Sequence, residues 1–293
     1  MLRAPILALF LAAPMALAPA VLSAQTPVPT PAQNSTQAEQ SPDTAPLIAA
    51  LRLYDLMAVL SAEGIAAADQ MEADMFPGQG SAAWQAVVSR IYSTDQMIAD
   101  MEAAFPTDIF TTDMLADLTT YFTTDPGAAI ITAELEARRI FAQPDVEAAA
   151  NEVYADSLAA ENPRLDLLRE FVAANDLLER NVMGALNSNF GFYQGLSDGN
   201  AFPAPMPEDL MLAEVWAQEP QIRADAEEWL YSFQLMAYDG ISDADVQSYV
   251  DLSRTPAGQA LNTALFTAFD AVLNRISYDL GQAAAVFVAG EET

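Results

Sequence analysis

The sequence contains no cysteine, no histidine and no lysine, so all 11 of its basic residues are arginine. These absences exclude disulfides, serine–histidine or cysteine–histidine catalysis, a lysine Schiff base, and a zinc site built from histidine or cysteine. The chain also carries 41 acidic residues, which gives it a net charge of −30. Because nucleic acids are bound through cationic contacts, we expect no nucleic-acid partner.

The N-terminus has the pattern of a secretory signal peptide. Arg3 precedes an apolar run that ends near Leu22, and the small residues Ser23 and Ala24 follow. We expect cleavage after Ala24, which would place the mature protein in the periplasm or outside the cell. Prolines interrupt the apolar run, and no later apolar stretch is long enough to cross a bilayer. We therefore expect no membrane span in the mature chain.

Residues 25–45 differ in composition from the rest of the chain. They are rich in proline, threonine, glutamine and serine and have almost no large apolar side chains. Such a segment cannot offset its ordering entropy by burial, so the sequence predicts a disordered tether. From Pro46 onward the good helix formers dominate. No stretch alternates as a strand would, and the sequence therefore predicts an all-α fold with no sheet.

The clearest helical pattern lies near the C-terminus. Six apolar residues recur there every three or four positions, namely Leu261, Leu265, Phe269, Val272, Ile276 and Leu280. This stripe predicts one helix of about 30 residues. Further helix starts are indicated by capping residues such as Ser242 and by Pro126 and Pro256.

The chain also resembles itself. Residues 111–133 match 242–264, residues 95–105 match 220–230, and the segment that begins at Arg52 matches the one that begins at Arg164. Because the three matches keep their order, we interpret them as an internal duplication that forms two related helical bundles. The expected boundaries are a signal peptide at 1–24, a tether at 25–45, a first helical repeat at 46–142, a connecting helix at 143–162, and a second helical repeat at 163–290 with an inserted loop at 188–207.

Each repeat contains an acidic helix start, a short apolar helix and a turn with proline and glycine. The two copies read TTDMLADLTTYFTTDPG at 111–127 and SDADVQSYVDLSRTPAG at 242–258. This unit resembles the uncharacterised exported bacterial all-helical domain catalogued as domain of unknown function 2059. The resemblance implies a helical fold and export, and it implies no reaction. In the two turns we expect Pro126 and Pro256 to open helices, while Gly127 and Gly258 allow a neighbouring helix to approach closely.

The sequence shows no catalytic, cofactor or metal site, and we expect no cofactor. Carboxylates are plentiful, but most lie on polar helix faces. Glu134 with Arg138 and Asp166 with Arg169 have the spacing of surface ion pairs. The acidic segment 239–245 lacks the ligand order of a calcium loop, and a helix cap explains it better.

We therefore hypothesise a non-enzymatic binding or scaffold module of the bacterial envelope, with an unidentified envelope protein as its partner. The candidate partner contacts are Phe190, Phe192, Tyr193 and Phe202. Aromatic residues are favoured at interfaces, although the same residues could simply belong to the core. The alternative functions are a carboxylate-dependent hydrolase or lyase and a cation-binding acidic protein.

Overall fold

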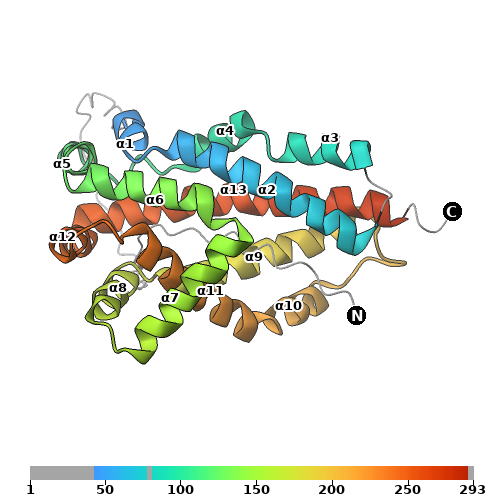
Figure 1. Ribbon diagram of the computed structural model, residues 1–293. Helices are drawn as coiled ribbons and strands as arrows, with labels where there is room; N and C mark the ends of the chain where they lie inside the picture. Colours follow the sequence, from blue (N-terminus) through green and yellow to red (C-terminus); the bar gives the residue numbers. More distant parts are fainter. Residues whose placement is uncertain (1–42, 78–80, 290–293) are drawn as a thin grey trace, which may run out of the picture.

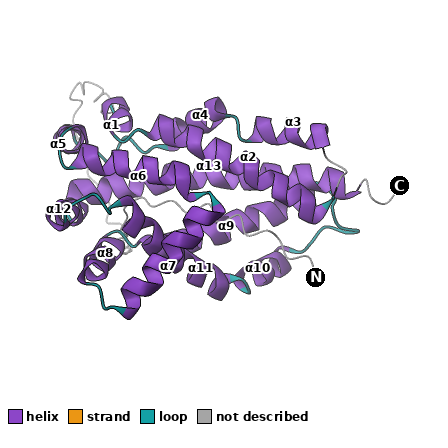
Figure 2. Cartoon of the chain, viewed as in Figure 1, coloured by secondary structure: helices purple, strands orange, loops and turns teal. Residues whose placement is uncertain are grey.

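The computed structural model describes residues 43–77 and 81–289 (Figure 1). The expected signal peptide and all but the last residues of the expected tether lie outside this part of the chain. The described residues form thirteen α-helices and no strand (Figure 2). The all-α prediction is therefore confirmed.

The helices fall into two series of six, with one connecting helix between them. The first series is α1 (Ala45–Ala50), α2 (Leu53–Met75), α3 (Ser81–Ile91), α4 (Thr94–Ala104), α5 (Thr112–Thr123) and α6 (Gly127–Phe141). The connecting helix is α7 (Pro144–Ala159). The second series is α8 (Pro163–Ala174), α9 (Leu177–Asp198), α10 (Glu208–Trp216), α11 (Glu219–Ala237), α12 (Asp243–Ser253) and α13 (Pro256–Ala289).

Local sequence explains where several of these helices begin. The hydroxyl of Thr111 accepts a hydrogen bond from the backbone amide of Met114, and Ser242 caps α12 in the same way through Asp245. Asn162 caps α8, where Pro163 occupies the first turn. Each cap provides an acceptor for an amide that has no partner inside its helix.

Helix α13 runs the length of the molecule (Figure 1). It contains 34 residues, and all six apolar residues of the predicted stripe are buried. The long closing helix is therefore confirmed. It packs against α9 on one side and against α3, α4 and α5 of the first series on another.

Helices α9 and α13 approach each other unusually closely at two glycines. A Cβ atom on Gly195 would lie 2.1 Å from the carbonyl oxygen of Tyr278, and one on Gly281 would lie 2.2 Å from that of Phe192. Side chains normally keep helix axes 8–10 Å apart, so this contact requires residues without a Cβ.

The expected inserted loop at 188–207 is wrong over most of its length. Residues 188–198 form the second half of α9, and only 199–207 lie outside a helix. The glycines at 191 and 195 lie within this helix and face α13. Their helix-weakening effect is offset by tertiary packing, which often overrides intrinsic propensity.

One hydrophobic core spans both series. Leu60 and Met97 of the first series belong to the same buried cluster as Leu168 and Phe269 of the second. Polar contacts also join the series, because Arg275 of α13 pairs with Asp100 of α4 and donates to the carbonyl oxygen of Ile91 at 3.1 Å. The two series therefore share a common interior.

Candidate functional site

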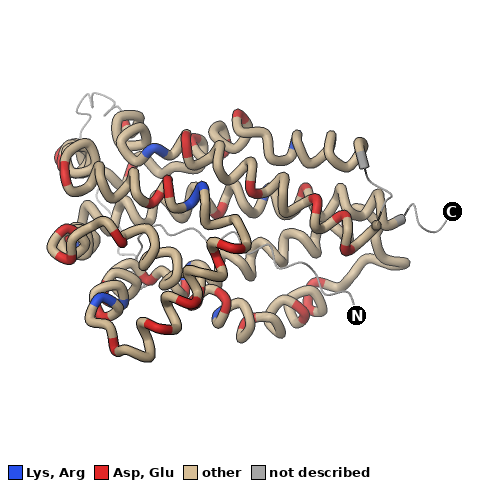
Figure 3. The backbone as a smooth tube through the Cα atoms, in the orientation of Figure 1, with Lys and Arg blue, Asp and Glu red and all other residues tan. Residues whose placement is uncertain are grey.

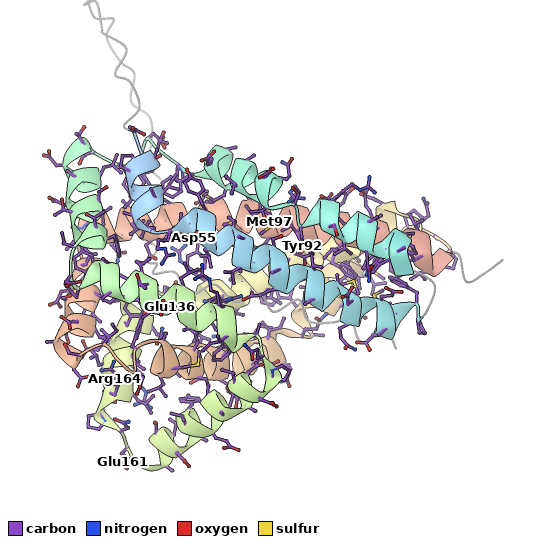
Figure 4. All side chains as sticks on the ribbon, turned by 45° about the horizontal axis from the view of Figure 1, so that its top comes forward. Asp55, Tyr92, Met97, Glu136, Glu161 and Arg164 are labelled. Carbon is purple, nitrogen blue, oxygen red and sulfur yellow. The ribbon has the colours of Figure 1, made fainter. Side chains whose placement is uncertain are left out.

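A pocket lies where the two helical series meet. It has a volume of about 70 Å³. That is room for several water molecules or a small organic group. Its walls come from the α1–α2 junction, α6, α11, α12 and α13. Figure 4 shows the adjacent pair of helices α2 and α6, marked by Asp55 and Glu136. We call this cavity the Glu134 pocket; it is lined by Leu51, Arg52, Leu53, Leu56, Ile131, Glu134, Leu135, Arg138, Trp229, Phe233, Tyr249, Leu265 and Phe269.

Glu134 is the acidic group of this mostly apolar lining. Its Oε1 accepts a hydrogen bond of 2.5 Å from the hydroxyl of Tyr238. Glu134 is half-buried in the wall of the pocket. Burial raises the pKa of Glu134 to about 7, and the Tyr238 hydrogen bond opposes part of that rise. The carboxyl therefore exchanges its proton near neutral pH.

Three tyrosines are close enough to Glu134 to feel its charge. Burial raises the pKa of Tyr238 and of Tyr249 well above the usual range, and the nearby Glu134 adds to both shifts. Burial also raises the pKa of Tyr121, whose hydroxyl lies 3.0 Å from Ser248 Oγ. These hydroxyls stay neutral at ordinary pH, so Glu134 titrates without a competing tyrosinate.

Arg138 forms part of the pocket wall one helical turn from Glu134. Its Nε donates to Glu63 Oε1 at 2.9 Å, and its Nη2 donates to Glu63 Oε2 at 2.7 Å. The guanidinium also lies 5.1 Å from the ring centre of Trp229. Arg138 and Trp229 line a second cavity as well, a groove of about 710 Å³. The two side chains therefore separate the Glu134 pocket from this wider groove.

The expected surface pair of Glu134 with Arg138 is wrong. The fork of Arg138 instead binds Glu63 of α2, 75 positions earlier in the chain. Spacing of four residues brings side chains within reach, but a bidentate partner on another helix satisfies the arginine better. The second expected pair is confirmed, because Arg169 and Asp166 lie 2.7 Å apart on the surface.

Arg52 lines the other end of the pocket from the α1–α2 junction. Its φ of 54° is left-handed, which turns the chain sharply between the two helices. Its Nε donates to Asp55 Oδ2 at 2.9 Å. Both arginines of the pocket lining therefore already have a carboxylate partner.

The aromatic residues proposed as partner contacts pack within the fold. Phe192 is buried, while Phe190, Tyr193 and Phe202 are partly buried against the cores. The exposed large apolar side chains nearby lie instead on α10, where Trp216 is 54% exposed. Sequence reasoning missed α10 because its apolar residues follow each other without a clear helical stripe.

The two turns with proline and glycine hold tight junctions between helices. A Cβ on Gly127 would lie 2.3 Å from the Tyr121 carbonyl oxygen, and one on Gly258 would lie 2.1 Å from that of Leu252. Pro126 directly precedes α6, and Pro256 is the first residue of α13. Each glycine allows its helix to start directly against the preceding one.

The acidic segment at 239–245 takes part in capping and ion pairing. Asp243 pairs with Arg164, which also donates to the carbonyl oxygens of Tyr238 and Ile241 at 2.6 and 2.9 Å. Ser242 donates to the carboxylate of Asp245 at 2.6 Å. Within the described ranges, no group of three or more acidic side chains is arranged to hold a metal ion.

Acidic residues lie on most of the described helices, although α1 and α3 contain none (Figure 3). None of the helices placed by the structure is both long enough and apolar enough to pass through a bilayer. The acidic surface attracts cations and repels anions over distances of about a Debye length.

Replacing Glu134 with glutamine should remove a pH dependence from the stability of the protein. Because burial raises the pKa of Glu134 from 4.5 to about 7, the folded state holds a proton that the unfolded chain releases between these values. The stability that this proton contributes is complete below pH 4.5 and is lost as the pH rises through 7. At pH 8 we expect the variant to exceed wild type by about 2 kcal/mol, less than the full shift implies because the pocket admits water.

Urea unfolding of both proteins at pH 5 and pH 8 measures this effect. The advantage of Glu134→Gln should shrink at pH 5, where wild-type Glu134 is protonated in the fold. Glu136→Gln is the matched control, because Glu136 is exposed on the same helix (Figure 4). Equal pH profiles for wild type and Glu134→Gln would show that Glu134 is solvated like a surface acid.

Comparison of the chain with protein-family models, with curated proteins and with solved structures finds no match.

Proposed function

We propose that this chain is an exported, non-enzymatic binding module of the bacterial envelope, and that the Glu134 pocket is its ligand site. The observation that carries the proposal is an apolar pocket between helices with a few converging polar groups, one of which has a shifted pKa. Ligand sites in helical proteins combine these features.

The pocket lining favours binding over hydrolysis. Hydrolysis by carboxylates needs two acidic side chains that face each other across the substrate. The described lining of the Glu134 pocket contains one, and the next acid, Glu63, is held by Arg138. A ligand site needs no second acid, so binding is the function that this geometry supports best.

Export is part of the proposal. The feature that supports it is the signal-like pattern before Gln25, in which Arg3 precedes an apolar run and small residues follow. The resemblance of 111–127 and 242–258 to domain of unknown function 2059 points the same way. We place the mature chain in the periplasm or outside the cell.

We also propose that the two helical series arose by duplication, so that the pocket lies between two related halves. Three features of the fold support this. The helices α1 and α2 are joined at left-handed Arg52, and α8 and α9 are joined at left-handed Asp176. Thr111 and Ser242 cap the fifth helix of each series. The sixth helices begin at the tight contacts of Gly127 and Gly258.

One of the matches seen in the sequence, that of Arg52 with Arg164, does not correspond in the fold. The position that corresponds to Arg52 in the fold is Asp176, whereas Arg164 lies in the first turn of α8. When Asp176 is aligned with Arg52, helices α1 to α6 correspond in order to helices α8 to α13.

An envelope protein that contacts α10 is the second candidate. Leu210, Leu212 and Trp216 are 46%, 40% and 54% exposed on this short helix. Apolar side chains gathered on one exposed helix are typical of protein contacts.

Filling the pocket should prevent ligand binding. We expect residues 25–293 to gain thermal stability with at least one member of a panel of alkyl and aryl alcohols, amines and acids. A ligand at about 100 times its dissociation constant adds about 2.7 kcal/mol to the free energy of unfolding. Leu56→Trp should abolish this gain, because Leu56 lines the pocket.

The control is Leu167→Phe, which enlarges another partly buried leucine outside the pocket lining. It should keep the gain in stability. The proposed site is wrong if no compound stabilises the protein, or if Leu56→Trp responds to the ligand as wild type does.

A further inference from the structure

Among the described residues, three charged side chains line the Glu134 pocket, and only the two arginines have a partner of opposite charge. Arg138 has a bidentate carboxylate partner in Glu63, and Arg52 pairs with one oxygen of Asp55. The hydrogen-bond partner of Glu134 is the neutral hydroxyl of Tyr238. Within residues 43–77 and 81–289, Glu134 takes part in no ion pair. An ionised Glu134 therefore leaves the pocket with one uncompensated negative charge, which a buried site tolerates poorly.

The aromatic lining suits a positive charge. Phe233, Tyr249 and Phe269 line the pocket with Glu134. Aromatic faces carry partial negative charge and attract cations that are removed from water. The wall already shows this chemistry, since the guanidinium of Arg138 lies over the ring of Trp229.

The charge of the whole molecule acts in the same direction. A net charge of −30 raises the concentration of cations near the surface and lowers that of anions. An anionic ligand would also have to displace Asp55 or Glu63 from its arginine. A ligand that carries an ammonium group is attracted by the net charge and does not compete with Asp55 or Glu63 for an arginine.

We propose that the Glu134 pocket binds a small organic cation, a short-chain alkyl amine whose ammonium group pairs with Glu134 while its apolar body lies against Phe233 and Phe269. This inference rests on the proposed function of the pocket. It specifies the ligand class as amines, in preference to neutral or anionic molecules of the same shape.

Amine binding should strengthen as the pH rises from 6 to 8. The other ionisable groups that face Glu134 do not change charge in this range. They are Tyr121 of α5, Tyr238 of α11 and Tyr249 of α12, which stay neutral, and Arg52 and Arg138, which stay charged. The pH dependence of binding should therefore follow the ionisation of Glu134.

The test compares propylamine, 1-propanol and propanoate, which share an apolar chain short enough for the pocket and differ in the charge of the head group. Calorimetric titration of residues 25–293 at pH 8 should give a dissociation constant for propylamine at least about tenfold lower than for propanol, since a charge-assisted contact adds that much. Glu134→Gln should weaken propylamine about tenfold and change the affinity for propanol much less. Glu136→Gln, an exposed acid on the same helix, should change neither.

The outcomes separate the ligand class from the site itself. Binding of propanol or propanoate at least as tightly as propylamine would overturn the amine inference and leave the pocket as a ligand site. Equal loss of propylamine affinity in Glu134→Gln and Glu136→Gln would also overturn it, because attraction would then come from the surface charge. If none of the three compounds binds and the wider panel also fails, both the inference and the proposed function are wrong.

Discussion

Replacing Arg138 with methionine should lower the free energy of unfolding by about 3–5 kcal/mol, because the change leaves a buried carboxylate without its partner. The side chains of Arg138 and Glu63 are only 10% and 15% exposed, and three hydrogen bonds join them. The same substitution also removes the guanidinium from the ring of Trp229.

Urea unfolding at pH 7 measures this loss, together with the double variant Glu63→Gln/Arg138→Met. The double variant should recover part of the stability, because it removes the buried charge as well as its partner. Arg169→Met is the surface control, since Arg169 and Asp166 are 50% and 77% exposed, and it should change stability by less than about 1 kcal/mol. A loss for Arg138→Met as small as that of the control would mean that water reaches Glu63 freely.

Replacing Gly281 with alanine should cost about 3 kcal/mol, although alanine is the better helix former by about 1 kcal/mol. The added Cβ would lie 2.2 Å from the Phe192 carbonyl oxygen and 2.9 Å from the Leu196 amide nitrogen. Both obstacles are backbone atoms of α9, so no side-chain rotation relieves them. The helices α9 and α13, which form the most extensive helix contact among the described residues, would have to separate.

Gly184→Ala is the matched control, because it makes the same substitution on α9 at a position where the added Cβ meets no backbone atom. Its Cβ would meet only Asp270 Oδ1, at 3.4 Å, so the helix-forming advantage of alanine should make this variant equal to or more stable than wild type. Thermal unfolding of both variants gives the comparison. If Gly281→Ala melts at or above the wild-type temperature, the close approach of α9 and α13 is not required by the fold.

The candidate site was only partly accessible to sequence reasoning. The spacing of Glu134 and Arg138 is that of a surface ion pair, and sequence offers no reason to separate them. The structure separates them because Glu63, on a different helix, accepts hydrogen bonds from both Nε and Nη2 of Arg138. Glu134 is then left with Tyr238, 104 positions away along the chain. A contact at that distance in sequence leaves no local pattern.

The opposite error occurred at residues 188–198. Aromatics and prolines in close succession predicted an inserted loop at 188–207, whereas residues 188–198, with glycines at 191 and 195, form the second half of α9. The glycines are explained by α13, which lies against them. Their role is visible only when the partner helix is known.

The sequence alone determined the helical character of the chain, its acidic surface, several helix caps and the buried stripe of α13, because each depends on residues a few positions apart. Tertiary structure decided which carboxylate each arginine binds, how closely α9 approaches α13, and that Glu134 faces a pocket between two helical series. These features depend on side chains from distant segments, whose distances are set only when the shared core forms.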